Sequence, residues 1–202
     1  MRDQRGLTLT ELLVALAMLG ILIAGAYQMA IHQGRAYSAQ DQIMEVQQNL
    51  RIALDQIVDD AQMAGYDSDR PASQIIIAQP VVPGDDHLTV SHEVNDTTER
   101  TVTYTLSGGQ LLKQVTFTDA SGASTPEPQE PLLDGVVGLI FNYGLDTNND
   151  GVADSWVPAS GTGTARIVAI RVRLSAGPTH PDLTNILLRE LESIATLRNG
   201  LL

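Results

Sequence analysis

The sequence has no cysteine and only one lysine, Lys113, among its 202 residues. The absence of cysteine excludes disulfides, thiolate metal sites and redox motifs, so the fold must hold together without covalent cross-links. Basic residues are few: 12 Lys and Arg stand against 24 Asp and Glu, which gives a formal net charge of −12. Such a chain repels phosphate backbones, so we expect no nucleic-acid partner.

The sequence also lacks the short motifs that carry common catalytic chemistry. It contains no Gly-x-Ser-x-Gly, no phosphate-binding loop and no dinucleotide fingerprint. The four histidines show no metal-ligand spacing with one another. Adjacent acids such as Asp59 and Asp60 point apart on a regular element and do not form a catalytic pair. We therefore expect a protein that is not an enzyme.

A long apolar segment lies at the N-terminus instead. Arg2 and Arg5 precede it, and no charged side chain lies between Leu12 and Ala30. Residues 7–30 would form about 36 Å of helix at 1.5 Å per residue, which is enough to cross the hydrocarbon core of a bilayer. Glu11 is the only charged residue in this span, and a carboxylate in lipid indicates a functional site because it needs a partner.

Charge and hydropathy alone allow two interpretations of this segment. It could be a secretory signal peptide, with Ala24-Gly25-Ala26 as the small-residue cleavage site and Tyr27 as the first mature residue. It could equally be an anchor that stays in the membrane. The first interpretation would make the rest of the chain a secreted module.

The residues around Glu11 favour the anchor. The run Gly6-Leu7-Thr8-Leu9-Thr10-Glu11-Leu12-Leu13-Val14-Ala15 resembles the type IV prepilin signature, although that family usually has Phe where this chain has Leu7. The resemblance implies that a prepilin peptidase removes residues 1–6 by cutting after Gly6, and that the new amine of Leu7 is methylated. It also implies that Glu11 pairs with that amine on a neighbouring subunit and sets the register of a filament.

An amphipathic stretch follows the apolar one. From residue 43 onward, apolar residues recur at steps of three and four along one stripe that ends at Ala64, just before Gly65. We therefore expect residues 31–65 to continue the helix of residues 7–30 and to end at the glycine. Residues 48–55 (QNLRIALD) and 63–66 (MAGY) resemble the helix end of PilW-type minor pilins.

Residues 66–202 change to short β-type runs separated by Gly, Pro, Asn and Asp, which predict a β-rich head. We expect strands at residues 75–79, 87–91, 101–106, 110–118, 136–143 and 167–174, with a hairpin at Ser107-Gly108-Gly109. Residues 121–131 predict an exposed loop. Residues 183–199 allow a helix or a strand, and the resemblance favours a strand. The expected class is α+β: a long N-terminal transmembrane and filament helix packed on an antiparallel sheet.

One loop of the head has the pattern of a metal site. Oxygen side chains alternate at Asp146, Asn148 and Asp150, Gly151 allows a sharp turn, and a carbonyl of Val152 and a carboxylate of Asp154 follow. This is the ligand order of the first nine EF-hand positions, and these hard oxygen ligands suit Ca²⁺. The closing Glu is absent, because Val157 stands at its place. We predict a structural Ca²⁺ loop, with a plain polar turn as the alternative.

The resemblance implies a minor pilin. Such a subunit is held in the inner membrane by its helix, with the head outside, until an inner-membrane assembly platform draws it into a type IV pilus, the filament behind cell adhesion and twitching motility. Its partners would be prepilin peptidase, that platform, membrane lipid before assembly, and other major and minor pilins, and its place would be the tip or priming complex. Two alternatives remain: a minor pseudopilin of a type II secretion system (GspJ-like), and a secreted calcium-binding module with a cleaved signal peptide.

Overall fold

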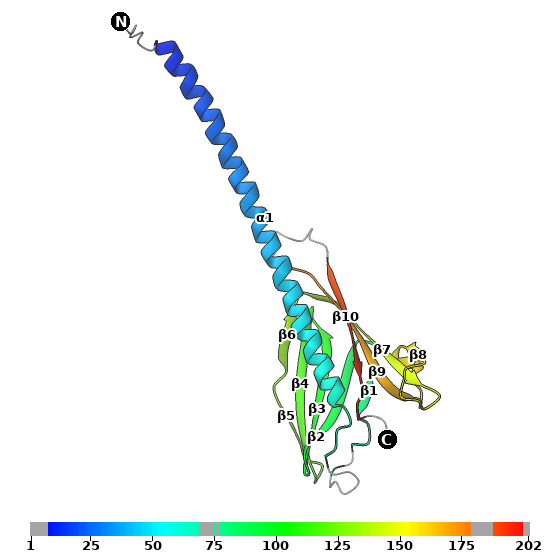
Figure 1. Ribbon diagram of the computed structural model, residues 1–202. Helices are drawn as coiled ribbons and strands as arrows, with labels where there is room; N and C mark the ends of the chain where they lie inside the picture. The colour runs from blue at the N-terminus through cyan, green and yellow to red at the C-terminus, as the bar shows by residue number, and fades with distance from the viewer. Residues whose placement is uncertain (1–7, 69–74, 76, 179–187, 200–202) are drawn as a thin grey trace. The chain divides into compact units, whose positions relative to one another are not determined.

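The computed structural model describes residues 8–68, 75, 77–178 and 188–199. They fall into two compact units, one within residues 1–44 and the other within residues 45–202. A single helix, α1 (Leu9–Met63), contributes to both units, and ten strands follow it (Figure 1). A long N-terminal helix followed by antiparallel sheets is the α+β, pilin-like class that the sequence predicts.

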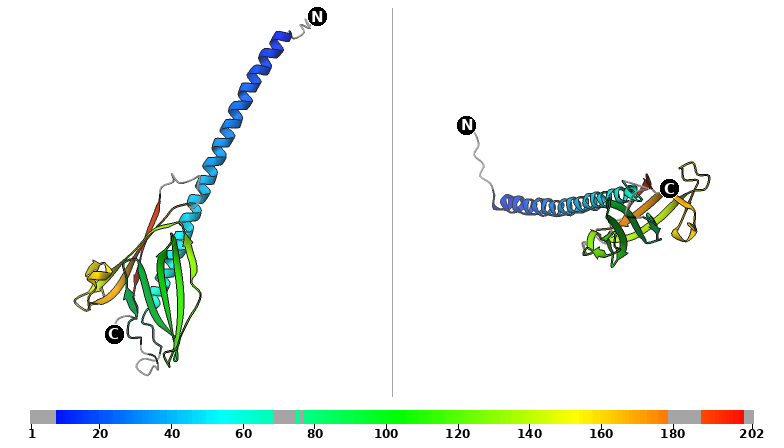
Figure 2. Two further views of the ribbon diagram at one scale, coloured as in Figure 1. Left: turned by 180° about the vertical axis from the view of Figure 1, so that it is seen from behind. Right: turned by 90° about the horizontal axis from the view of Figure 1, so that it is seen from below.

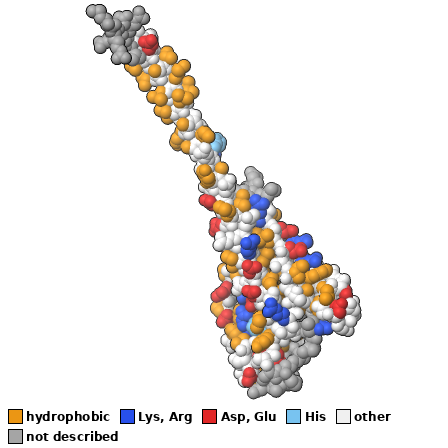
Figure 3. All heavy atoms as spheres, in the orientation of Figure 1, with side chains coloured by type: hydrophobic (Ala, Val, Ile, Leu, Met, Phe, Trp, Pro, Cys, Tyr) orange, Lys and Arg blue, Asp and Glu red, His pale blue; other side chains and the backbone are white. Residues whose placement is uncertain are grey.

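In the first unit, α1 is apolar on all sides from Leu12 to Tyr27, and polar side chains such as Arg35 and Asp41 follow. Its large apolar side chains from Leu9 to Met29 are between 51% and 76% exposed. They form the apolar surface that runs along the helix in Figure 3. Among the described residues, α1 alone is long and apolar enough to cross a membrane, with a mean hydropathy of 2.2 in its candidate spanning window.

In the second unit, the last turns of α1 bury the predicted stripe. The buried residues are Leu50, Ala53, Leu54, Ile57 and Ala61, and Ala64 continues the stripe past the helix end. Gly65 ends the helix with a φ of 72°, a conformation that glycine adopts without strain. Its amide donates to the Ser91 carbonyl at 2.8 Å, so the predicted stop is confirmed and also joins the helix end to the sheet.

The first sheet, sheet A, is antiparallel and has the order β1-β2-β3-β4-β5 (Figure 2). Its strands are β1 (Val81–Pro83), β2 (His87–Asn95), β3 (Thr98–Ser107), β4 (Gln110–Asp119) and β5 (Ser124–Pro126). A sixth strand, β6 (Glu130–Asp134), pairs with β4 near the opposite end of that strand from β5. Gly108 and Gly109 have φ values of 58° and 77° and close the β3–β4 hairpin, as predicted.

The second sheet, sheet B, is antiparallel with the order β10-β9-β7-β8. Its strands are β7 (Val136–Asp146), β8 (Ser155–Val157), β9 (Arg166–Ala176) and β10 (Arg189–Thr196), and a short 3-10 helix, η1 (Ala159–Gly161), follows β8. The inner faces of both sheets and the apolar stripe of α1 form one core. Its largest fully buried side chains are Tyr104, Tyr143 and Phe141.

The structure tests three of the predictions made for the head. The strand expected at residues 75–79 is wrong: the edge strand lies at Val81–Pro83, because the Pro80 carbonyl accepts the Ser91 amide and places the following residues beside β2. Residues 121–131 are exposed as expected, yet they include β5 and the start of β6. The C-terminal segment is a strand over Arg189–Thr196, as the resemblance favoured, while residues 183–187 lie outside the described part.

Candidate functional sites in the helix and the head

The start of α1 places Glu11 in a capping box. The Thr8 amide and hydroxyl both donate to Glu11 Oε2, at 3.0 and 2.8 Å, and the Glu11 amide approaches Thr8 Oγ1 at 3.3 Å. This arrangement satisfies amides that have no acceptor within the helix. Gly6 and Leu7, the predicted cleavage and methylation positions, lie outside the described residues.

Thr8 is a residue that the sequence interpretation missed. The spacing Thr8-x-x-Glu11 directly before an apolar run is the signature of a capping box and could have revealed it. Only Oε2 of Glu11 is engaged by Thr8, and the described residues offer Oε1 no partner. One carboxylate oxygen therefore fixes the helix start, while the other can accept a hydrogen bond from outside the chain.

The predicted metal loop follows β7 and is organised around Asp146. The Asp146 side chain is buried, and its two oxygens accept the amides of Asn149, Asp150 and Gly151 at 2.7–3.2 Å. The Arg166 guanidinium lies 3.5 Å from Asp146 Oδ2. Asn149 and Gly151 have φ values of 64° and 84°, which let the backbone wrap around this carboxylate.

The other predicted ligands meet on the outer side of the same loop. Asn148 Nδ2 lies 3.1 Å from Asp150 Oδ2 and 3.3 Å from Asp154 Oδ1, so one amide group joins two carboxylates. Two hydrogen bonds from Thr147, from its hydroxyl and its amide, lower the pKa of the Asp154 carboxyl. The Val152 amide donates to Asp150 Oδ1. In the described part of the chain, no three His, Cys, Asp or Glu side chains are grouped as a metal would need.

A half-buried ionic cluster joins α1 to sheet A within the second unit. Asp60 accepts hydrogen bonds from Arg100 Nη1 at 2.9 Å and from Tyr104, and forms an ion pair with Lys113 Nζ at 2.8 Å. The Lys113 ammonium also lies 5.5 Å from the Tyr104 ring centroid. The sequence interpretation considered Asp60 only as one of two adjacent acids, and it missed this role for Asp60 and for the single lysine.

Burial and neighbouring charges set the protonation of this cluster. Burial alone raises the pKa of the Asp60 carboxyl, but the hydrogen bonds from Lys113, Tyr104 and Arg100 outweigh it and hold the pKa below its usual value. Burial raises the pKa of Tyr104, so its hydroxyl stays a donor. Burial and the nearby Arg100 lower the pKa of His92, whose buried Nδ1 has no hydrogen-bond partner among the described residues.

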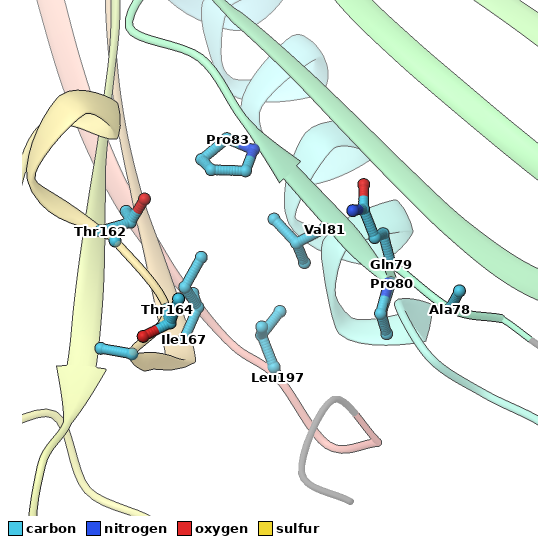
Figure 4. Close-up of a pocket in the computed structure, with 11 residues that line it drawn as sticks. Ala78, Gln79, Pro80, Val81, Pro83, Thr162, Thr164, Ile167 and Leu197 are labelled. Carbon is cyan, nitrogen blue, oxygen red and sulfur yellow. The ribbon is translucent and has the colours of Figure 1, made fainter.

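A groove of about 380 Å³ lies between strand β1 of sheet A and the segments of sheet B that precede β9 and follow β10 (Figure 4). Val81, Ile167 and Leu197 point into it from three different segments, and Thr162 and Thr164 lie on one wall. None of its lining side chains is titratable. The groove therefore lacks the acid, base or nucleophile that a catalytic pocket needs.

Comparison with protein families agrees with these features. Residues 101–185, which begin within β3 and extend past the end of β9, match the family described as Type IV Pilus-assembly protein W. Residues 1–27, which include the capping box, match the prokaryotic N-terminal methylation motif. The two matches together identify a PilW-type type IV pilus-assembly protein with a prepilin methylation motif at its N-terminus. No curated protein sequence matches it.

Family membership fixes the broad class of the protein. It is a prepilin-like minor pilin with a structural role and is not an enzyme. The methylation motif implies processing by a prepilin peptidase, and the family implies contact with the type IV pilus assembly machinery. The N-terminal apolar helix is consistent with anchoring in the inner membrane and later incorporation into a pilus.

Proposed function

We propose that this chain acts at or near the tip of a type IV pilus, in a complex of minor pilins that primes assembly. The observation that carries the proposal is the pair of unlike surfaces on one chain. From Leu12 to Tyr27, α1 carries no charged side chain and is apolar on every side, whereas the second unit carries a strong excess of acid.

Each surface limits how the chain can be used. The apolar helix must lie in lipid or against other helices, because leaving it in water would expose many large side chains. Residues 45–202 carry 21 acidic and 9 basic side chains. Heads of this charge repel their own copies at distances below the Debye length of about 8 Å. A subunit present once or a few times at a tip avoids that repulsion.

Stoichiometry and position test the proposal. Sheared pili should contain this chain at a small fraction of the major pilin by quantitative mass spectrometry, and antibodies against the head should label filament ends. Deleting the gene should strongly reduce surface pili, and the wild-type gene should restore them. Labelling along the whole filament length would overturn the tip position, and normal piliation without the gene would overturn the priming role.

We also propose that Glu11 pairs with the mature N-terminal amine of a neighbouring subunit. The support is Glu11 Oε1, which has no partner among the described residues and lies in a span that has no other charge, together with the Thr8 bonds that hold the carboxylate in place. Glu11→Ala should leave membrane insertion and cleavage intact and reduce incorporation into pili. The matched control is Asp41→Ala, which removes an exposed acid of the same helix. Equal incorporation of both variants would refute the pairing.

We propose further that the loop of residues 146–154 binds Ca²⁺ for a structural purpose. The supporting observation is the position of Asn148 Nδ2 between two carboxylates, where a cation would be favourable. Since amide oxygen and nitrogen are interchanged by rotation of the side chain, Asn148 can present its oxygen there instead. Asp146, whose oxygens hold loop amides, would take part with its remaining lone pairs, and the Val152 carbonyl would complete the set.

Thermal unfolding of residues 33–202 tests the calcium proposal. Calcium at a hundredfold excess over its dissociation constant would stabilise the head by about 2.7 kcal/mol, so Tm should rise with calcium and fall with chelator. Magnesium should do less, because it requires a tighter octahedral shell. Asp150→Asn keeps the acceptor for the Val152 amide but should lose the response, whereas Asp55→Asn on α1 should keep it. An equal Tm in calcium and chelator would mean that the loop is only a turn.

A further inference from the structure

The tip of the β2–β3 hairpin carries an asparagine in an unusual polar setting. Asp96 and Thr97 form a two-residue turn between Asn95 and Thr98, the last paired residues of the two strands. Asn95 and Asp96 are exposed, as is Val94, which precedes them. The hairpin and the neighbouring β4–β5 turn lie together, because the Ala120 amide donates to the Thr97 carbonyl at 3.0 Å.

The side chain of Asn95 is oriented by Thr97. Both the amide and the hydroxyl of Thr97 donate to Asn95 Oδ1, each at 3.0 Å. No acceptor for Asn95 Nδ2 is present in the described part of the chain, so this nitrogen faces solvent. A turn of this kind needs only the backbone amide as donor. The hydroxyl at position 97 is an additional feature that a simple turn does not require.

Asn95, Asp96 and Thr97 form an Asn-x-Thr triplet without proline, which is the acceptor sequence for N-glycosylation. It is the only Asn-x-Ser/Thr triplet in the 202 residues. The chain thus places its single acceptor triplet at an exposed hairpin tip instead of within a buried strand.

We propose that Asn95 is an N-glycosylation site of the exported head. The donor would be an oligosaccharide linked to a polyprenyl diphosphate, and the catalyst a membrane oligosaccharyltransferase. Asn95 Nδ2 forms a bond to C1 of the first sugar, the bond from C1 to the phosphate oxygen breaks, polyprenyl diphosphate leaves, and Nδ2 loses one proton to a base of the transferase. The proposal rests on the proposed function in one respect: the head must lie outside the cytoplasm.

The surroundings of Asn95 tolerate a bound saccharide. The core side chains of β2 and β3, such as Val90 and Val102, lie farther along the strands, so a glycan at the tip disturbs no apolar contact. Glu93 is buried and accepts hydrogen bonds from the amide and hydroxyl of Ser68. In the folded head the turn at Asn95 is therefore presented to solvent, whereas Glu93 is not.

Mass spectrometry of the full-length chain, purified from the membranes of its native host, tests the proposal. Peptides that contain Asn95 should carry a saccharide mass, with fragment ions that place it on Asn95. The modification should be absent from Asn95→Gln and Thr97→Val and retained, at reduced occupancy, in Thr97→Ser. Asn142→Gln, which removes an asparagine outside any acceptor triplet, should remain fully modified.

Two further measurements separate the outcomes. The N-terminal peptide shows whether residues 1–6 have been removed, and protease added outside the inner membrane shows whether the head is exported. A glycan on Asn95 supports the proposal even if the tip role fails. An unmodified Asn95 in cleaved and exported chains overturns it while leaving the pilin role intact. An unmodified Asn95 in a head that stays in the cytoplasm overturns both the site and the export on which it rests.

Discussion

Helix α1 has two stretches that both carry large apolar side chains but differ in how far these side chains are buried. From Leu9 to Met29, every large apolar side chain is at least 51% exposed. From Leu50 to Ala61, the side chains of the apolar stripe are at most 3% exposed. Burying one Leu or Ile side chain contributes about 1.5–3 kcal/mol of favourable free energy. The isolated chain does not gain this free energy in the first stretch, because the side chains there are exposed.

The comparison indicates that the apolar side chains of the two stretches are covered by different partners. The second stretch finds its partners in the sheets of its own chain. The first can find them only in lipid or in the helices of other subunits, which is the behaviour of a prepilin before and after assembly. A change in the first stretch should therefore alter processing and assembly, whereas a change in the second should alter the stability of the head.

Blocking cleavage should have the largest effect. Gly6→Val places a branched side chain where the peptidase accepts glycine, so we expect complete loss of processing and of incorporation into pili. Mass spectrometry should find residues 1–6 still attached. The matched control is Gly20→Val, since no atom lies within 4 Å of a Cβ added at position 20. A wild-type chain that begins at Tyr27 would instead show that the N-terminus is a signal peptide.

Removing a core side chain from the second stretch should have the next largest effect. Ile57 is fully buried and Ile52, five residues earlier on the same helix, is 53% exposed. Ile57→Ala should lower the free energy of unfolding of residues 33–202 by about 2–5 kcal/mol. Ile52→Ala should change it by less than about 0.5 kcal/mol. Urea denaturation measures both, and equal losses would show that the stripe is not the surface that holds the helix.

The sequence predicts these two stretches well because each depends on a local pattern. In the first stretch the pattern is a continuous apolar run, and in the second it is the recurrence of apolar residues at steps of three and four. The apolar stripe, its stop at Gly65 and the Gly108-Gly109 turn follow from spacing and from the φ preference of glycine. The PilW-type assignment also came from local residues, at both ends of the helix. The candidate loop after β7 could be located in the same way, since its residues are contiguous.

Features that depend on distant residues could not be predicted. Residues 75–79 have the β-branched composition of a strand, but the edge of sheet A is chosen by Pro80, whose carbonyl meets Ser91. The pairing of Asp60 could not be predicted, because its partners are 40 or more residues away in sequence. The role of Asp146 in the candidate loop after β7 could not be predicted either, since a pattern of oxygens does not say which of them accept backbone amides.

The ionic cluster allows a smaller test of how α1 is held to sheet A. Asp60→Asn removes the charge that Arg100 and Lys113 share and should cost about 1.5–3 kcal/mol, the range for hydrogen bonds to charged groups. Asp59→Asn, at the adjacent exposed position, should be nearly neutral. Chemical denaturation of residues 33–202 at neutral pH measures both. If the two variants are equally stable, the cluster does not contribute to the attachment of the helix.

The smallest expected effect is the dependence of this attachment on pH. The pKa of Asp60 is lower in the folded head than in the unfolded chain, so the unfolded state binds a proton first as the pH falls. The stabilisation is complete above the ordinary carboxyl pKa of about 3.9 and is lost as the pH drops through the lowered value. His92 acts in the same direction at higher pH: its lowered pKa makes protonation below about 6.5 favour the unfolded chain.

Two variants separate these contributions. In Asp60→Asn, the acid limb of the stability curve should become flatter, while the loss that begins near pH 6.5 should remain. In His92→Phe, the upper limb should disappear and the acid limb should remain, provided that the variant still folds at pH 8. The measurement is the free energy of unfolding between pH 3 and pH 8. An acid limb of the same slope in Asp60→Asn would show that other carboxylates, such as Asp154 and Asp119, govern it, since their pKa values are also lowered.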